Sequence, residues 1–327
     1  SPDRVGPTNM RILVTGGAGF VGANLVKALE SELGATETIV LDDLSSGFRE
    51  NLVGTSATFV EGSILDPVAL ARAIDGCSTV VHLAARASVP KSIEDPVSAH
   101  EVNATGTLRV LEACRKSGVN HLIVASSSSV YGRTEVLPKR EDLPTRPMSP
   151  YAASKLATES YALAWGECYG LPVLAFRFFN IYGPLQHPRH SYAAAIPAFL
   201  AAAFQDRPIP LFGDGSQTRD FTYVDSVTRV IVKALQERTS HPEPVNLAFG
   251  SRISLLELIE RLEAIFDRSL PTDLLPARVG DVAHSQADTD VLHKLYPHIE
   301  PINLEDGLKS TASWFEATRP WERPGLG

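Results

Sequence analysis

The chain has 327 residues, of which 44% are hydrophobic and 21% are charged, with a formal net charge of -8. This composition is typical of a soluble globular protein with one large or two medium domains. The acidic balance offers no basic face for nucleic acid, and no run of apolar residues is long enough to cross a membrane.

Residues 1–9 are polar and rich in Pro and Gly, so we expect a flexible leader without an export signal. Beyond them, apolar runs rich in β-branched residues alternate with segments of helical periodicity, the first of which begins at about Phe20. Six runs predict buried parallel strands: residues 11–16 (RILVTG), 38–43 (TIVLDD), 57–62 (ATFVEG), 79–84 (TVVHLA), 121–127 (HLIVASS) and 173–180 (VLAFRFFN). The alternation predicts an α/β fold with a doubly wound, Rossmann-type parallel sheet.

Small or polar residues follow each of these strands, as a ligand site at the carboxyl ends of a parallel sheet requires. They are Gly16, Asp42, Gly62 with Ser63, Ala84 with Ala85, Ser126 with Ser127, and Asn180. We therefore expect a ligand to lie along this edge of the sheet.

A smaller, discontinuous C-terminal domain is expected after Asn180, where Pro and Gly become denser and Ser254 to Phe266 has a helical pattern. Asp220 to Leu235 indicates a strand and helix that return to the sheet. We expect a dinucleotide-binding domain over 10–180 plus about 220–250, and a second, substrate-binding domain over 181–219 plus about 251–320.

The three cysteines, Cys77, Cys114 and Cys168, include no CxxC pair. They predict neither a disulfide framework nor a metal site, and they indicate buried thiols in a reducing, cytoplasmic compartment.

Gly16, Gly19 and Gly22 stand at GxxGxxG spacing between the first strand and its helix. Such glycines let the backbone approach a pyrophosphate at the helix N-terminus. Asp42, at the end of the second strand, can accept hydrogen bonds from both ribose hydroxyls of an adenosine and would repel a 2'-phosphate. The pattern predicts an NAD site rather than an NADP site.

The segment SPYAASK follows the serine-ended strand, with Ser149 as the expected N-cap and Pro150 at the first helical position. Tyr151 and Lys155 are then one turn apart on one face of the helix. An ammonium near the phenol would lower the pKa of Tyr151 toward neutrality, which suits a general base.

Taken together, the motifs resemble the extended short-chain dehydrogenase/reductases that act on nucleotide sugars, in particular the UDP-hexose 4-epimerases. The resemblance covers nearly the whole chain from Met10. It is carried by TGGAGFVG, HLAA (82–85), SSSSVYG, SPYAASK, RFFNIYGP (177–184), YAAAIP (192–197), GDGSQTRDFTYV (213–224) and RVGDVAHSQAD (278–288).

The resemblance implies a site for each ligand. The catalytic residues would be Ser127, Tyr151 and Lys155. NAD would be bound by Gly16, Gly19, Phe20, Val21, Gly22, Asp42, Asp43, Ser63, Ile64, Leu83, Ala84, Ala85, Asn103, Tyr151 and Lys155. The UDP-sugar would be bound by Ser88, Ser127, Ser128, Ser129, Tyr151, Asn180, Ala194, Arg219, Arg278, Asp281 and Ser285. Ser63 departs from the aspartate that relatives commonly carry there, which weakens one contact to the adenine.

The serine run distinguishes the reactions known in this family. The dehydratases typically carry Asp-Glu after the catalytic hydroxyl, and UDP-glucuronate decarboxylases commonly carry a glutamate at the second position; this chain has Ser128 and Ser129. Loss of water needs a positioned acid and base, whereas epimerisation needs only transient oxidation at C4. We therefore expect a 4-epimerase for UDP-glucose/galactose. UDP-glucuronate decarboxylation, UDP-glucuronate 4-epimerisation and a catalytically silent binding module stay as alternatives.

Two finer expectations also follow from the resemblance. Ser285 stands at a position where the 4-epimerases that accept N-acetylhexosamines carry a small residue. A homodimer would form through the apolar helices around Leu108, Val110, Leu111 and Tyr161 to Leu163.

Overall fold

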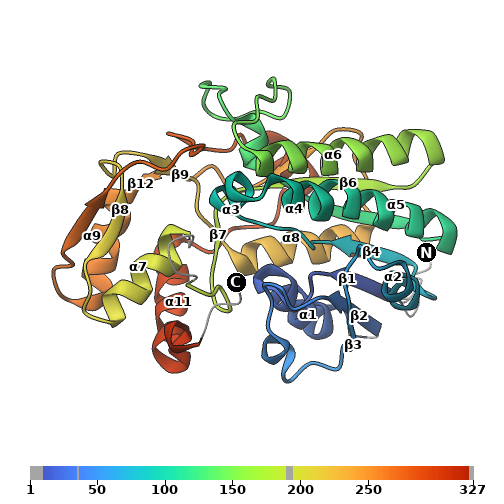
Figure 1. Cartoon of the computed structure of the whole chain (residues 1–327), viewed down its shortest axis with the longest axis horizontal. Helices are drawn as coiled ribbons and strands as arrows, with labels where there is room; N and C mark the ends of the chain where they lie inside the picture. Colours follow the sequence, from blue (N-terminus) through green and yellow to red (C-terminus); the bar gives the residue numbers. More distant parts are fainter. Residues whose placement is uncertain (1–9, 35–36, 189–193, 324–327) are drawn as a thin grey trace.

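The computed structural model describes residues 10–34, 37–188 and 194–323, and its centre is a parallel sheet (Figure 1). The six expected strands are all present, and a seventh, which the sequence pattern did not predict, joins at the edge beside β6. In sheet order the strands are β11 (Val245–Leu247), β6 (Val173–Phe178), β5 (His121–Ser127), β4 (Thr79–His82), β1 (Arg11–Thr15), β2 (Glu37–Asp42) and β3 (Thr58–Glu61). The doubly wound, Rossmann-type expectation is confirmed.

Helices cover both faces of the sheet (Figure 1). α1 (Phe20–Leu33) and α8 (Val224–Glu237) pack on one face. The other face carries α2 (Pro67–Ile74), α5 (Gly106–Ser117) and α6 (Pro150–Tyr169). The strand order reverses between β1 and β4, so the connections leave these two strands in opposite directions and open a crevice at their carboxyl ends.

Short helical segments connect the longer elements of this part of the molecule. They are η1 (Arg49–Leu52), α3 (Val89–Glu94), α4 (Pro96–His100), the π-helical turn η2 (Glu101–Thr105) and η3 (Ser128–Tyr131).

A second, smaller part of the molecule has its own apolar core, with Phe199, Leu258 and Phe315 fully or almost fully buried. Its helices are α7 (Ala195–Phe204), α9 (Leu255–Phe266), α11 (Leu304–Thr318) and the short η4 (Pro320–Glu322). Its strands pair as β8 (Ile209–Phe212) with β13 (Thr272–Leu275), β9 (Thr218–Arg219) with β12 (Ile253–Ser254), and β7 (Ile181–Tyr182) with β10 (Thr222–Tyr223). The helix expected from Ser254 is confirmed as α9, which Ser254 and Glu257 begin with a capping box.

The chain crosses between the two parts at different places than expected. α8 does return to the sheet, but the strand before it, β10, pairs with β7 outside the central sheet. In addition, α10 (Asp290–Leu295) packs on the sheet core through Leu292 and Tyr296. We therefore propose the expected division into two domains with residues 287–299 transferred to the dinucleotide-binding domain.

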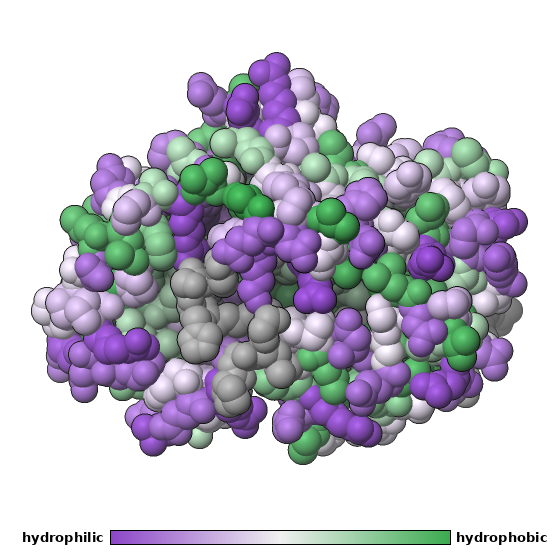
Figure 2. All heavy atoms as spheres, in the orientation of Figure 1, coloured by the Kyte–Doolittle hydropathy of each residue, from purple (hydrophilic) through white to green (hydrophobic). Residues whose placement is uncertain are grey.

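Figure 2 shows hydrophilic side chains over most of one face, with hydrophobic ones in smaller patches. No helix among the described residues is long and apolar enough to cross a membrane.

Cys77 and Cys114 are buried, and burial raises the pKa of their thiols to about 11 and about 12. Cys168 is exposed, so the expectation of three buried thiols is wrong for this residue.

Candidate active site

The glycine turn is shaped for a close ligand. Gly16 has φ of +69°, and a Cβ built there would lie 2.9 Å from the backbone nitrogen of Ala84. A Cβ on Gly22 would overlap the carbonyl oxygen of Gly16. No side chain caps α1 at Gly19, so the first N–H groups of the helix remain available to an anion.

A cavity of about 310 Å³ extends from this turn along the ends of β1, β2 and β3. Twelve of the residues expected to bind the cofactor line it: Gly16, Gly19, Phe20, Val21, Gly22, Asp42, Asp43, Ser63, Ile64, Leu83, Ala84 and Ala85. Asp42 is buried, and its two oxygens accept from Ala18 N (3.0 Å) and Leu44 N (2.9 Å). Burial raises the pKa of Asp42, and these backbone donors oppose the shift. The tight turn and the aspartate fit an adenosine diphosphate.

The expected catalytic residues come together in a neighbouring cavity of about 390 Å³. Ser127 ends β5, and Tyr151 and Lys155 project from the first turns of α6, which Ser149 caps by accepting from Ala152 N. Ser127 and Tyr151 are joined by a side-chain hydrogen bond. Phe20, Val21, Leu83 and Ala85 line both this cavity and the previous one, so a cofactor in the first can reach the reacting groups in the second.

The expected pKa of Tyr151 is wrong in direction. Burial raises the pKa of its phenol, and the hydrogen bond with Ser127 only opposes this. Burial also lowers the pKa of Lys155 to about 8, against the attraction of Glu159. Helical spacing alone could not predict this result, because desolvation depends on the residues that close over the pair.

The four serines differ in their roles. Ser127 Oγ accepts from Ser129 N (3.1 Å) and lies 2.9 Å from Ser129 Oγ. Ser128 and Ser129 line the same cavity. Ser126 points to the other side of the strand, where its hydroxyl donates to Glu159 at 2.6 Å.

Behind the catalytic strand lies a buried ion pair that the sequence reasoning missed. Arg177 donates to both carboxylate oxygens of Glu159, at 2.6 and 2.9 Å. Its guanidinium lies 4.7 Å from the ring centre of Tyr131, whose hydroxyl donates to Asn246 at 2.6 Å. The network joins β5, β6, β11 and α6. Its only sequence signal is a glutamate one turn after Lys155.

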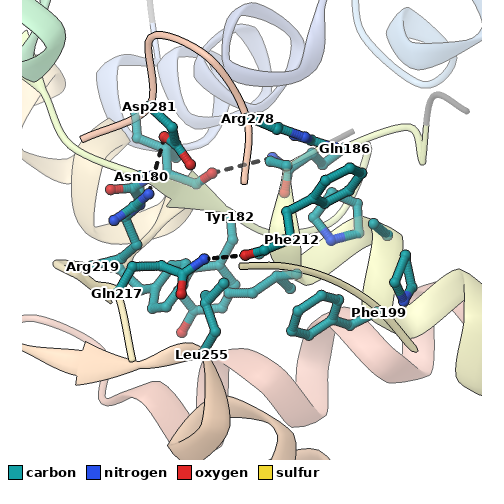
Figure 3. Close-up of a pocket in the computed structure, with 18 residues that line it drawn as sticks. Asn180, Tyr182, Gln186, Phe199, Phe212, Gln217, Arg219, Leu255, Arg278 and Asp281 are labelled. Carbon is teal, nitrogen blue, oxygen red and sulfur yellow. Dashed lines mark hydrogen bonds and ion pairs between the residues drawn. The ribbon is translucent and has the colours of Figure 1, made fainter. Parts of the chain in front are cut away.

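The third cavity, of about 150 Å³, lies between the two parts of the molecule (Figure 3). Arg219 forms an ion pair with Asp281 at 3.0 Å, and the guanidinium of Arg278 lies 3.9 Å from the ring centre of Phe212. Asn180 and Ala194 also line this cavity. Two arginines and an aromatic ring suit a nucleoside diphosphate.

Ser285 lines the catalytic cavity, as do Asn180, Arg219 and Asp281. Two expected ligand contacts, in contrast, line none of the three cavities. Asn103 is buried and bonds through its side chain to the Arg86 backbone and to Ser154, so its place is to support the cavity wall. The hydroxyl of Ser88 instead caps α3 by accepting from Lys91 N.

Gln186 was not expected at the site, yet it lines all three cavities, alone among the described residues. No local pattern marks it, because its position depends on the loop that follows β7.

The chain is similar to known proteins over most of its length. The model of the NAD-dependent epimerase/dehydratase family matches residues 12–248. A UDP-glucose 4-epimerase of Mycolicibacterium smegmatis is 35% identical over 94% of this chain and 98% of its own length. A UDP-glucuronate 4-epimerase of Thermodesulfobacterium geofontis is 35% identical over 92% of this chain and 95% of its own. The solved UDP-N-acetylglucosamine 4-epimerase from Methanobrevibacter ruminantium, in complex with UDP-N-acetylmuramic acid, matches with a TM-score of 0.88 and 32% identity, covering 95% of this chain and 99% of that one.

Proposed function

The chain belongs to the NAD-dependent epimerase/dehydratase family, and from that premise we propose that it is an epimerase acting at C4 of UDP-hexoses. One observation carries the choice of reaction. Among the described residues of the catalytic cavity, the only carboxylate is Asp281, and Arg219 already pairs with it. Loss of water or of carbon dioxide would draw on a free acid or base beside the sugar, and hydroxyls with a pKa far from neutrality are poor substitutes.

In the proposed reaction, Tyr151 accepts the proton of the 4-hydroxyl and later returns it. Ser127, bonded to the phenol, donates to the same sugar oxygen and holds the ketone. Lys155, with a pKa of about 8, carries a positive charge at neutral pH and favours the phenolate. NAD, held by the residues that line the cofactor cavity, would supply the hydride acceptor and donor for the transient oxidation at C4. Turning the ketone requires space, and Ala87, Ser128 and Ser129 line the cavity with small side chains.

We propose that the nucleotide lies in the third cavity. Arg219 and Arg278 would bind the diphosphate with Asn180, and Asp281 would accept from the uridine ribose. The relatives named above act on three different UDP-sugars. We therefore infer the sugar that this chain binds from its own residues. Ser285 is small and lines the cavity, which supports UDP-glucose/galactose together with UDP-N-acetylhexosamines.

The test is to incubate the purified protein with UDP-glucose, UDP-N-acetylglucosamine and UDP-glucuronate and to follow the products by NMR and mass spectrometry. We expect an unchanged mass and an inverted C4 for the first two. Loss of carbon dioxide from the third would identify a decarboxylase, and its inversion alone a glucuronate 4-epimerase. No change in any of them, with NAD still bound, would identify a silent binding module.

We also propose a homodimer, with an interface that differs from the one expected from the sequence. Val110 and Leu111 are fully buried in the sheet core and cannot contact a partner. Val97 on α4 and Tyr161 and Tyr169 on α6 are instead exposed apolar side chains on neighbouring helices. This apolar surface supports pairing of two copies through α4 and α6.

A further inference from the structure

The loop after β7 has an unusual backbone. Leu185 has φ of +71°, a left-handed conformation that is unfavourable for a residue other than glycine unless the surroundings impose it. Here α1 imposes it, because Asn24 Nδ2 donates to the carbonyl oxygen of Pro184 at 2.9 Å. The same Asn24 group donates to Phe20 O at 2.9 Å, so the loop is fixed to the first turn after the glycine motif. A conformation held in this way positions the next residue, Gln186.

The amide of Gln186 has a defined orientation. Its Nε2 donates to the carbonyl oxygen of Ile181 at 3.2 Å, and because a carbonyl can only accept, the NH₂ group must face that side. The carbonyl Oε1 is thereby directed away from Ile181. It is buried and has no hydrogen-bond partner among the described residues. An unsatisfied buried acceptor is costly, and in a ligand site it indicates a group that the ligand supplies.

The position limits what that group can be. Gln186 contributes to the cofactor cavity, the catalytic cavity and the nucleotide cavity, and in Figure 3 it lies across the last of these from Arg219. Diphosphate oxygens are acceptors and cannot satisfy Oε1. The remaining candidates are hydrogen-bond donors of the two ligands: the ribose hydroxyls and nicotinamide carboxamide of the cofactor, or the hydroxyls of the sugar nucleotide.

We propose that Gln186 is a ligand-binding residue whose Oε1 accepts a hydrogen bond from a hydroxyl or amide group of NAD or of the UDP-sugar, at the point where the two ligands meet. This proposal rests on the proposed function for the identity of the second ligand only.

The test is Gln186→Met, which keeps the length and packing of the side chain but removes the acceptor. The matched control is Gln205→Met, because Gln205 also donates to a backbone carbonyl, Ala201 O, but lines none of the three cavities. Calorimetry would measure NAD binding to the protein freed of cofactor, then UDP and UDP-glucose binding to the NAD-loaded protein. Thermal unfolding without ligands would show that each variant is folded.

We expect Gln186→Met to weaken at least one ligand roughly ten-fold, because a ligand donor loses its buried partner, while Gln205→Met changes none. Weaker NAD places the donor on the cofactor. Weaker UDP and UDP-glucose alike place it on the nucleotide, and weaker UDP-glucose alone places it on the sugar. Unchanged affinity for all three would overturn the proposal, as would an equal loss in the control. If Gln186→Met does not fold, Gln186→Leu takes its place in the same measurements.

These outcomes can be distinguished from a failure of the proposed function. NAD binding reports on Gln186 whether or not any sugar is epimerised, and an inactive wild-type protein would leave the NAD comparison intact.

Discussion

At the scale of single residues, Tyr151 shows how burial and hydrogen bonding compete. Burial raises the pKa of its phenol, and the side chain of Ser127 opposes this rise. In the proposed reaction, a positive charge on Lys155 would also favour the phenolate. In the proposed reaction, the base therefore depends on both Ser127 and Lys155.

Tyr151→Phe removes the proton acceptor and keeps the ring that fills the cavity wall. We expect turnover of UDP-glucose to fall by about 10²–10⁴-fold, the usual contribution of a positioned general base. NAD content and thermal unfolding should stay close to wild type. Near-normal turnover would remove Tyr151 from the mechanism.

Ser285→Tyr fills space in the catalytic cavity, where Ser285 is a small lining residue. We expect kcat/KM for UDP-N-acetylglucosamine to fall far more than that for UDP-glucose, because overpacking penalises the larger occupant. Ser285→Ala, which keeps the space open, is the control and should leave the ratio unchanged. Equal losses on both substrates would show that Ser285 does not select between them.

At the scale of elements, the Glu159–Arg177 pair holds β5, β6 and α6 in one arrangement. Both side chains are almost completely buried, and Glu159 also accepts from Ser126 on the catalytic strand. The pair therefore fixes the strand that presents Ser127 against the helix that presents Tyr151 and Lys155. We regard both residues as positioning residues, because neither lines a cavity.

Glu159→Gln leaves the Arg177 charge buried without its counter-ion, and we expect a loss of ~3–5 kcal/mol in the free energy of unfolding. The kinetic effect separates positioning from plain destabilisation. Glu159 raises the pKa of Lys155, so its removal should move the alkaline limb of the pH–rate profile to lower pH.

The control for this change is Glu305→Gln, which breaks the exposed i,i+4 pair with Lys309 and should change neither the free energy of unfolding nor the pH–rate profile measurably. An alkaline limb of Glu159→Gln that coincides with wild type would contradict the link to Lys155.

At the scale of the whole molecule, Asp220 connects segments that belong to different parts of the chain. It is fully buried and accepts from Gly250 N, Ser251 Oγ and Ala287 N, at 3.1, 2.9 and 2.9 Å. It thereby fixes the stretch that carries Ser285 to the loop that follows β11.

Burial raises the pKa of Asp220 from 3.8 to about 6. A raised folded-state pKa means that the folded protein binds more protons than the unfolded chain between these values, so this group's contribution to stability falls as pH rises from 3.8 to about 6. In Asp220→Asn that pH dependence should disappear. The free energy of unfolding should also fall by an amount that does not change with pH, because the hydrogen bonds are altered. The measurement is urea unfolding of both proteins across this range. A wild-type minus variant difference that does not change with pH would contradict the expectation.

The proposed homodimer is tested with Tyr161→Glu, which places a charge on a side chain that is 42% exposed on α6. We expect wild type to elute as a dimer and the variant as a monomer in size-exclusion chromatography with light scattering. Val68→Glu introduces the same charge at an exposed apolar residue of α2 and should leave the dimer intact. A monomeric wild type, or two variants that behave alike, would exclude this interface.

The sequence by itself determined the features that depend on local rules. The alternating apolar runs predicted six of the seven central strands. The glycine spacing, the Ser149 cap and the Tyr151–Lys155 spacing located the tight turn before α1 and the face of α6 that lines the cavity with Ser127. Each is encoded within about one helical turn or one strand, through backbone geometry and side-chain periodicity. The sequence pattern did not predict the seventh strand, because Val245–Leu247 is too short to show an alternation of apolar residues.

Tertiary structure alone decided which distant residues meet and how burial changes them. Arg177 pairs with Glu159 across β6 and α6, Asp220 reaches Ala287, and Gln186 lies where three cavities meet. It also placed Asn103 outside the lining of the three cavities, with its side chain bonded to Ser154, and reversed the expected pKa shift of Tyr151. Contacts and desolvation of this kind depend on how segments far apart in the chain pack together, which no local pattern encodes.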